Sequence, residues 1–272
     1  NYPDNVYLWE KKDGKYQGTS YKDTRKIVLN LAAGLVSIGF KKKDRAGLVS
    51  DGRNDWIISE LGMLYAGGVN VPLSIRLHET ELIFILKHSG SKYIFVSGPH
   101  AQKIEEIRND LPDLKKVIFI DGKENPGEND INYSDLIKQG EKYLKTHQDE
   151  VKAIWEAIQP DDLANISYTS GTTADPKGIM LSHLNYAANV VQSNTLMELQ
   201  SDWRTLAILP WDHAFAHTAC LYAFMFKGAS IGSVEVGRTP LETLKNIPQN
   251  IKEIKPSVLM SVPAFSKKFR QN

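Results

Sequence analysis

Short runs of strand-forming residues alternate with helical patterns along almost the whole chain, and this alternation constrains the fold most. The strand pattern is present at residues 6–10, 15–19, 45–50, 69–73, 93–97, 117–120, 163–168, 205–209, 230–234 and 258–262. Apolar residues at every third or fourth position indicate helices at 20–38, 54–64, 79–89, 101–110, within 133–159, and at 184–199, 216–226, 241–254 and 264–270. Residues 121–132 are rich in turn formers and predict a surface loop. The order predicts βαβ units, and therefore an α/β fold with mostly parallel sheet.

The segment at residues 166–182 has the most distinctive chemistry. It reads Ile-Ser-Tyr-Thr-Ser-Gly-Thr-Thr-Ala-Asp-Pro-Lys-Gly-Ile-Met-Leu-Ser, with four hydroxyl side chains around one glycine and a lysine after them. Hydroxyls, backbone N–H groups and an ammonium bind phosphate oxygens, and Gly171 lets the backbone approach an anion closely. Ser182 is a good N-cap for a following helix, whose positive end is expected to face the same anion. The segment therefore predicts a phosphate-binding loop between a strand and a capped helix.

Two alternatives to this interpretation are weaker. The loop of nucleotide triphosphatases reads Gly-x-x-x-x-Gly-Lys-Ser/Thr, whereas here Pro176 precedes Lys177 and has no N–H to donate. A kinase or nucleotide triphosphatase would also be expected to have an acidic residue at the end of a strand, and this sequence shows no such pattern. A flexible linker would share the Ser, Thr and Gly composition, but the position between an apolar strand and a capped helix favours phosphate binding.

Composition excludes some classes of function. The net charge of +1 over 272 residues gives no electrostatic case for binding nucleic acid. The single cysteine, Cys220, cannot form an intramolecular disulfide, which indicates a reducing cytoplasm, and its apolar neighbours favour packing over a catalytic thiol. Residues 205–226 lack Lys and Arg, but Pro210, Asp212 and two histidines interrupt them, so no membrane span is predicted.

Residues 168–178, together with Ser182-His183, closely resemble the signature loop of the adenylate-forming superfamily. This superfamily contains acyl-CoA synthetases, firefly-type luciferases and the adenylation domains of peptide synthetases. Ala174 stands where the family usually has glycine, and alanine fits there only with negative φ or with strain. The resemblance extends to residues 20–23, 31–35, 43–45, 54–56, 67–73, 209–213, 255–258 and 262–263. The residues at positions 210–215 and 262–269 are most similar to those of long-chain fatty acyl-CoA synthetases.

The resemblance implies two interleaved, mostly parallel α/β subdomains. Residues 45–200 are expected to form one subdomain, and residues 1–44 plus 201–272 part of the second, which is left incomplete. In the family, a Mg²⁺-binding Glu, a ribose-binding Asp, a hinge and a catalytic Lys on a C-terminal domain all follow later. The chain is therefore expected to be an N-terminal fragment, with little or no ligase activity alone. An unfinished sheet exposes an edge, so pairing with another copy into a homodimer is also expected.

The resemblance also implies a chemistry in two half-reactions. A carboxylate attacks the α-phosphorus of ATP to give an acyl-adenylate and pyrophosphate, and a thiol, usually coenzyme A, then displaces AMP. By motif position, the residues that hold the β- and γ-phosphates are Thr169, Ser170, Gly171, Thr172 and Thr173. Lys177 is implied to support the loop or the phosphates catalytically. The Thr169 hydroxyl is also implied to touch Mg²⁺.

Two histidines are candidates for the acyl site. His213 matches the family's residue beside the acyl carboxylate, which implies catalytic and substrate-binding roles. His217 stands where some long-chain relatives guard the acyl tunnel, and a packed core histidine is an equal alternative. A zinc site on the pair lacks a third ligand and the Glu that follows the first His in metalloproteases. Trp211 and Phe215 either line the acyl pocket or pack in the core.

The sequence thus predicts ATP-dependent activation of a carboxylic acid, with a long-chain fatty acid as the expected substrate and coenzyme A as the acceptor. A non-catalytic nucleotide- or acyl-binding module is one alternative, and an amino-acid adenylation domain of peptide synthesis is another. The expected partners are the small-molecule acid, ATP, Mg²⁺ and coenzyme A. Peripheral membrane contact would follow from an insoluble substrate, although no basic amphipathic helix demonstrates it.

Overall fold

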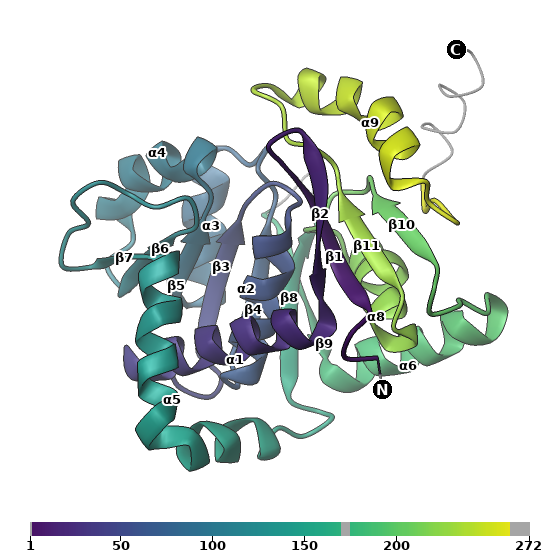
Figure 1. Ribbon diagram of the computed structural model, residues 1–272. Coiled ribbons are helices and arrows are strands. Elements are labelled where there is room, and N and C mark those ends of the chain that lie inside the picture. The colour runs from purple at the N-terminus through teal and green to yellow at the C-terminus, as the bar shows by residue number, and fades with distance from the viewer. Residues whose placement is uncertain (1, 170–174, 262–272) are drawn as a thin grey trace. The chain divides into compact units, whose positions relative to one another are not determined.

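The computed structural model describes residues 2–169 and 175–261, which form two compact units (Figure 1). The larger unit contains Arg25–Asp51 and Asp55–Tyr186, and the smaller contains residues 2–24, Gly52–Asn54 and 187–261. These limits differ from the boundaries at residues 44 and 200 that the sequence predicts. One reason is that helix α1 (Tyr21–Ser37) packs on helix α5 (Tyr133–Glu156), where a Cβ on Gly140 would lie 1.7 Å from the Asn30 carbonyl oxygen.

The larger unit is built on a seven-stranded sheet with the order β7-β6-β5-β3-β4-β8-β9. Its strands are β3 (Arg45–Val49), β4 (Val69–Leu73), β5 (Ser91–Val96), β6 (Lys116–Phe119), β7 (Asp130–Asn132), β8 (Leu163–Thr169) and β9 (Lys177–Ser182). All neighbouring pairs are parallel except β8 and β9. Its further helices are α2 (Asn54–Tyr65), α3 (Glu79–Ser89) and α4 (Gly98–Ile107), which a 3₁₀ turn at Arg108–Asp110 extends. In Figure 1, α1 and α5 lie in front of the sheet.

The core of the larger unit is apolar on the strands and on the helices that cover them. Buried Val71, Ile94 and Val117 lie on neighbouring or nearby strands, and Leu82 and Ile104 face them from α3 and α4. Strands buried on both faces read as continuous apolar runs, which is why the sequence revealed them. This core holds the sheet whose last two strands carry the phosphate-loop motif.

The smaller unit contains a four-stranded sheet with the order β10-β11-β1-β2. Its strands are β1 (Val6–Lys12), β2 (Lys15–Ser20), β10 (Arg204–Ala207) and β11 (Ser230–Ser233). β1 and β2 are joined by Asp13 and Gly14, both with positive φ, as a two-residue hairpin requires. Its helical elements are most of α6 (His183–Leu196), α7 (Ala214–Ala216), the π-helical turn η2 (His217–Tyr222), α8 (Ala223–Lys227) and α9 (Pro240–Ile254).

The mixed α/β class and the mostly parallel sheets are confirmed, and three local predictions are wrong. Lys177–Ser182 is a strand rather than part of a loop, because it pairs antiparallel with β8. Asp130–Asn132, inside the predicted surface loop, pairs parallel with β6. Residues 258–261 form no strand, although the Ser257 N–H donates to the Arg204 carbonyl at the start of β10. The predicted helix at 264–270 lies outside the described residues.

Among the helices in the described ranges, none has the length and apolar character needed to cross a membrane.

Candidate active site

The phosphate-loop motif forms the tip of the β8–β9 hairpin. Thr169 and Lys177 are the last registered pair of the two strands, so they face each other where the loop begins and ends. The tip follows the carboxyl end of β8, and ligands of open α/β sheets bind at that edge. The four other predicted phosphate ligands and the unusual alanine lie outside the described residues; they are Ser170, Gly171, Thr172, Thr173 and Ala174.

Lys177 presents an available positive charge at this tip. Its side chain is exposed, and within residues 2–169 and 175–261 no hydrogen bond or ion pair engages its ammonium. Thr169, on the opposite strand, is also exposed. A hydroxyl and an unengaged ammonium side by side suit phosphate oxygens, and the hydroxyl oxygen is a ligand type that Mg²⁺ accepts.

Next to its tip, the hairpin is held by Tyr168 and Gly178 of the motif and by His88, which the sequence did not single out. The Tyr168 hydroxyl is hydrogen-bonded to His88 Nδ1 at 2.8 Å, and the two rings meet edge to face. Tyr168 also lies over Gly178, where an added Cβ would be 3.1 Å from the tyrosine Cζ. Burial raises the pKa of the Tyr168 hydroxyl, so it stays protonated. Gly178 was visible in the motif, but His88 is 80 residues from Tyr168 and gave no local signal.

The predicted orientation of the following helix is wrong, although its cap is confirmed. Ser182 Oγ accepts a hydrogen bond from the Asn185 N–H at 3.3 Å, and Asn185 Oδ1 accepts one from the Ser182 N–H at 2.8 Å. Ser182 pairs with Leu163 at the far end of the hairpin from Lys177. The six residues of β9 separate the α6 N-terminus from the loop by about 17 Å at the usual rise of a strand. The positive end of α6 therefore lies well away from Thr169 and Lys177, where the loop begins and ends.

The predicted acyl-site residues begin a helical segment in the smaller unit. His213 is exposed and caps α7, since its Nδ1 accepts a hydrogen bond from the Phe215 N–H at 3.2 Å. This bond requires an unprotonated Nδ1, so the neutral ring carries its hydrogen on Nε2. Nε2–H is then a donor suited to a carboxylate oxygen. Phe215 is 47% exposed, whereas Trp211 is buried against Gly52 and donates from Nε1 to the Ala207 carbonyl.

His217 and Cys220 lie in the π-helical turn and are fully buried. The rings of His217 and Tyr222 are 6.1 Å apart, a packing arrangement that a core histidine would adopt. Burial raises the pKa of the Cys220 thiol to about 12, so the thiol is inert at neutral pH. Among the described residues, no group of three or more His, Cys, Asp or Glu side chains could hold a metal ion.

The structure brings Thr169 and Lys177 together in the larger unit. It brings His213 and Phe215 together in one turn of the smaller unit, near Trp211 and His217 in sequence.

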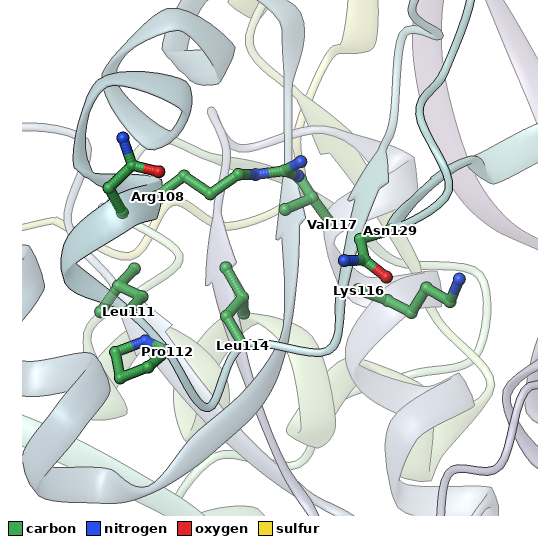
Figure 2. A pocket seen from close by; sticks show the side chains of 8 residues that line it. Arg108, Leu111, Pro112, Leu114, Lys116, Val117 and Asn129 are labelled. Carbon is green, nitrogen blue, oxygen red and sulfur yellow. The ribbon is translucent and has the colours of Figure 1, made fainter.

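A pocket of about 270 Å³ lies elsewhere in the larger unit (Figure 2). It is lined partly by Arg108 and by Lys116, which is the first residue of β6. β6 and β8 run in the same direction. The pocket lies at the amino-terminal ends of these strands, whereas the hairpin tip lies at their carboxyl-terminal ends. Arg108 is paired with Asp130, and Lys116 Nζ donates to the Glu128 carbonyl at 2.5 Å. Its cations are therefore engaged, and it is not the candidate phosphate site.

The sequence pattern of a known protein family, described as AMP-binding enzyme, matches residues 1–272. The chain belongs to the AMP-binding enzyme family. The resemblance to adenylate-forming enzymes, inferred above from the hydroxyl-rich loop, is confirmed.

Individual relatives agree with this family. The chain is 28% identical to a chloroplastic long-chain-fatty-acid–[acyl-carrier-protein] ligase of Arabidopsis thaliana, over 96% of this chain and 36% of that protein. It is 28% identical to a long-chain-fatty-acid–CoA ligase of Mycobacterium bovis, over 98% of this chain and 42% of that protein. The chain thus spans well under half the length of these relatives.

The fold also matches solved structures of the family. An anthranilate CoA ligase in complex with anthranoyl-AMP superimposes with a TM-score of 0.78 at 20% identity, over 95% of this chain and 46% of that chain. At this identity the likeness establishes the shared fold. The mixed α/β fold with mostly parallel sheets is therefore shared with that ligase.

Proposed function

We propose that this protein uses ATP to activate a carboxylic acid as an acyl-adenylate and then transfers the acyl group to a thiol. The observation that carries the proposal is the hairpin tip, where Lys177, whose ammonium has no partner among the described residues, pairs in register with Thr169. Membership of the AMP-binding enzyme family gives this phosphate-binding geometry its chemical context.

In the first step, a carboxylate oxygen bonds to the α-phosphorus of ATP and the bond between the α-phosphorus and the bridging oxygen breaks. Negative charge then builds on the departing pyrophosphate. The Lys177 ammonium and the hydroxyls of the loop (Thr169, Ser170, Thr172 and Thr173) stabilise that charge, together with the Gly171 backbone. The Thr169 hydroxyl is also proposed as a ligand of Mg²⁺, which neutralises phosphate charge when bound.

In the second step, the thiol sulfur bonds to the acyl carbonyl carbon, AMP departs, and the thiol proton is released to solvent. His213 Nε2–H is proposed to hydrogen-bond the acyl carboxylate, since Nδ1 is already occupied by the cap. Phe215 and Trp211 are proposed as apolar walls for the acyl group. Buried His217 is proposed to set the depth of that pocket from within the π-helical turn.

A long-chain fatty acid is the proposed substrate, because both relatives described above are named as long-chain-fatty-acid ligases. Their acceptors differ, since one name specifies acyl carrier protein and the other coenzyme A. We propose coenzyme A as the acceptor. A cytoplasmic location, peripheral contact with membranes that supply the acid, and a homodimer complete the proposal.

A panel of carboxylic acids tests this function in the full-length protein. AMP release is measured with ATP, Mg²⁺ and coenzyme A, using acids from acetate to palmitate, anthranilate and several amino acids. The proposal predicts the fastest release with palmitate, and thioester formed in equal amount to AMP. ATP binding without AMP release for any acid would favour a non-catalytic binding module. Release that depends on an amino acid would favour the adenylation domain of a peptide synthetase.

A further inference from the structure

The hairpin that carries the phosphate loop joins the rest of its sheet through strand β4. β8 and β9 share six registered pairs, and β3 and β4 share five. β8 and β4 share one registered pair, Asn70 with Asn165. Ile166 on β8 also packs in the apolar core of the sheet, so the junction has an apolar part and a polar part at Asn70 and Asn165.

A buried polar cluster surrounds this junction. Asn70 and Asn165 are 0% and 1% exposed, and Glu60 on α2 is 1% exposed. Asn70 Nδ2 donates to Glu60 Oε1 at 2.9 Å. On β8, Ser167 Oγ donates to Asn165 Oδ1 at 2.8 Å. Burying three such groups costs free energy unless they are hydrogen-bonded, and a purely apolar junction would avoid that cost.

Helix α6 reaches the same cluster. Burial, followed by the Glu60 carboxylate, raises the pKa of the Tyr186 hydroxyl, and Tyr186 also forms a hydrogen bond with the Ser167 side chain. The cluster thus links α2, β4, β8 and α6 around the base of the hairpin. α2 and β4 lie far in sequence from β8 and α6, so the junction ties the hairpin to an earlier part of the larger unit.

The cluster also contains an unused donor and an unused acceptor. Asn165 Nδ2 and Asn70 Oδ1 are buried and have no hydrogen-bond partner among the described residues. They belong to directly paired residues on parallel strands, whose side chains project to the same face. The junction therefore holds an unpaired donor and an unpaired acceptor on neighbouring strands.

We propose that Glu60, Asn70 and Asn165 are positioning residues that set the place of the phosphate-loop hairpin against the sheet. Their side chains are buried, which places them inside the unit rather than at its surface. They act through β8, which ends at Thr169, one residue before the loop. This inference rests on the proposed function for its consequence in ATP binding, but its structural content concerns the hairpin alone.

Backbone amide exchange in the full-length protein tests the proposal without nucleotide. Asn70→Leu and Glu60→Leu are compared with Glu60→Gln, which keeps the acceptor oxygen for Asn70. Exchange is followed in peptides that cover β8 and β9 and, as an internal reference, in β3. Asn250→Leu is the matched control, since Asn250 is a buried amide in the smaller unit that accepts from the Glu235 N–H.

We expect exchange in the hairpin to rise about tenfold or more in Asn70→Leu and Glu60→Leu, the effect of losing one buried hydrogen bond to a charged group. Exchange in β3 should stay unchanged. Glu60→Gln should restore most of the protection, and Asn250→Leu should leave the hairpin as in the wild type. Ser167→Ala removes a half-buried hydroxyl and serves if the larger changes prevent folding; it should raise hairpin exchange by about threefold.

Equilibrium binding of ATP then separates this inference from the proposed function. If both are right, ATP affinity falls in the same variants by a factor similar to the rise in exchange, and Glu60→Gln recovers it. If the wild type does not bind ATP, the proposed function fails, while the exchange result still decides the role of the cluster. Unchanged hairpin exchange in Asn70→Leu and Ser167→Ala, or an equal rise in β3, would overturn the positioning role.

Discussion

At the scale of single residues, Lys177 is the most direct test of phosphate binding. Lys177→Ala is expected to slow adenylate formation on the order of a hundredfold, because one donor to the developing charge is lost. Thioester formation from a supplied adenylate should change little, since pyrophosphate has already left. Pyrophosphate exchange and thiolysis of the adenylate measure the two steps separately. Lys145→Ala, an exposed lysine on α5, is the control, and equal losses in both steps would argue against a phosphate role.

A second residue-scale prediction concerns the contact between α1 and α5. Replacing glycine by alanine inside a helix usually stabilises it by about 0.5–1 kcal/mol. At Gly140 the new Cβ would lie 1.7 Å from the Asn30 carbonyl oxygen, so the two helices would have to move apart. We expect Gly140→Ala to destabilise the protein by about 3 kcal/mol. Urea unfolding measures the change, and Gly127→Ala, whose nearest atom lies at 3.6 Å, should be near neutral.

Residue types also explain how much of the candidate site could be predicted. The hydroxyl residues of the phosphate loop and Lys177 could be predicted because they are concentrated in one stretch of sequence. His88, Asn70 and Glu60 were not found, because each resembles an ordinary helix or strand residue until the sheet places it beside β8. The predicted roles of the loop residues, His213 and His217 stay predictions. Contacts formed across long sequence separations leave no local pattern to read.

At the scale of elements, strand β7 depends on one side chain. Asp130 is buried and holds Lys123, Arg108 and the Gly127 N–H. Burial raises the pKa of its carboxyl, but the bonds from Lys123 and Arg108 outweigh it, and the pKa lies below its ordinary value. Because the folded pKa is lowered, this carboxylate stabilises the fold fully above its unfolded pKa near 4. The contribution is lost as pH falls through the lower folded value.

We therefore expect Asp130→Asn to destabilise the protein by about 2 kcal/mol at pH 7, the usual worth of hydrogen bonds to a charged group. The difference from the wild type should narrow as pH falls below about 4, because the unfolded carboxyl is then protonated and the folded carboxyl follows at its lower pKa. Thermal unfolding at a series of pH values measures it. Asp113→Asn, at an exposed position, should show no such dependence. A difference that stays constant down to pH 3 would contradict the ion-pair explanation.

Elements with a local sequence pattern could be predicted, whereas short elements that depend on tertiary contacts could not. Helix α3 was predicted with its observed bounds, Glu79–Ser89, because its apolar residues recur with helical spacing and Gly90 ends it with positive φ. β7 is three residues long and stands in a segment of turn formers, so no propensity reveals it. β9 lies in the segment 166–182 that predicts a loop, because glycine and proline in that segment interrupt the strand pattern between β8 and β9. Short elements held by tertiary contacts escape a local reading.

At the scale of the whole molecule, alternation of strand and helix predicted the α/β class correctly. The subdomain boundaries that the family resemblance implies at residues 44 and 200 stay predictions, and the two compact units of the structure divide at other residues. Helix α1 begins in the smaller unit and continues into the larger, and residues 52–54 return to the smaller unit in the middle of the larger. Such crossings depend on packing between helices, as at Gly34, where a Cβ would lie 2.3 Å from the Leu136 carbonyl oxygen. The spacing of apolar residues identifies helices and strands, while the packing between their surfaces determines which unit each of them joins.

The last prediction concerns association of the whole molecule through strand β9. Within the part of the chain that the structure describes, β9 pairs with β8 on one side and is the last strand of its sheet. Ile179 and Met180 on it are 48% and 70% exposed. Apolar side chains on a strand with an open edge favour pairing with another copy. We expect concentration-dependent association, weakened about tenfold by Met180→Lys, since a charge on an edge strand opposes pairing.

Sedimentation velocity over a range of concentrations measures this association. Leu241→Lys is the matched control, because Leu241 is 60% exposed but lies on helix α9, which has no open backbone edge to extend. If apolar exposure alone caused association, both variants would weaken it to a similar extent. If strand pairing is the cause, Met180→Lys should act much more strongly. A wild-type chain that sediments as a monomer at every concentration would remove the case for a homodimer through this edge.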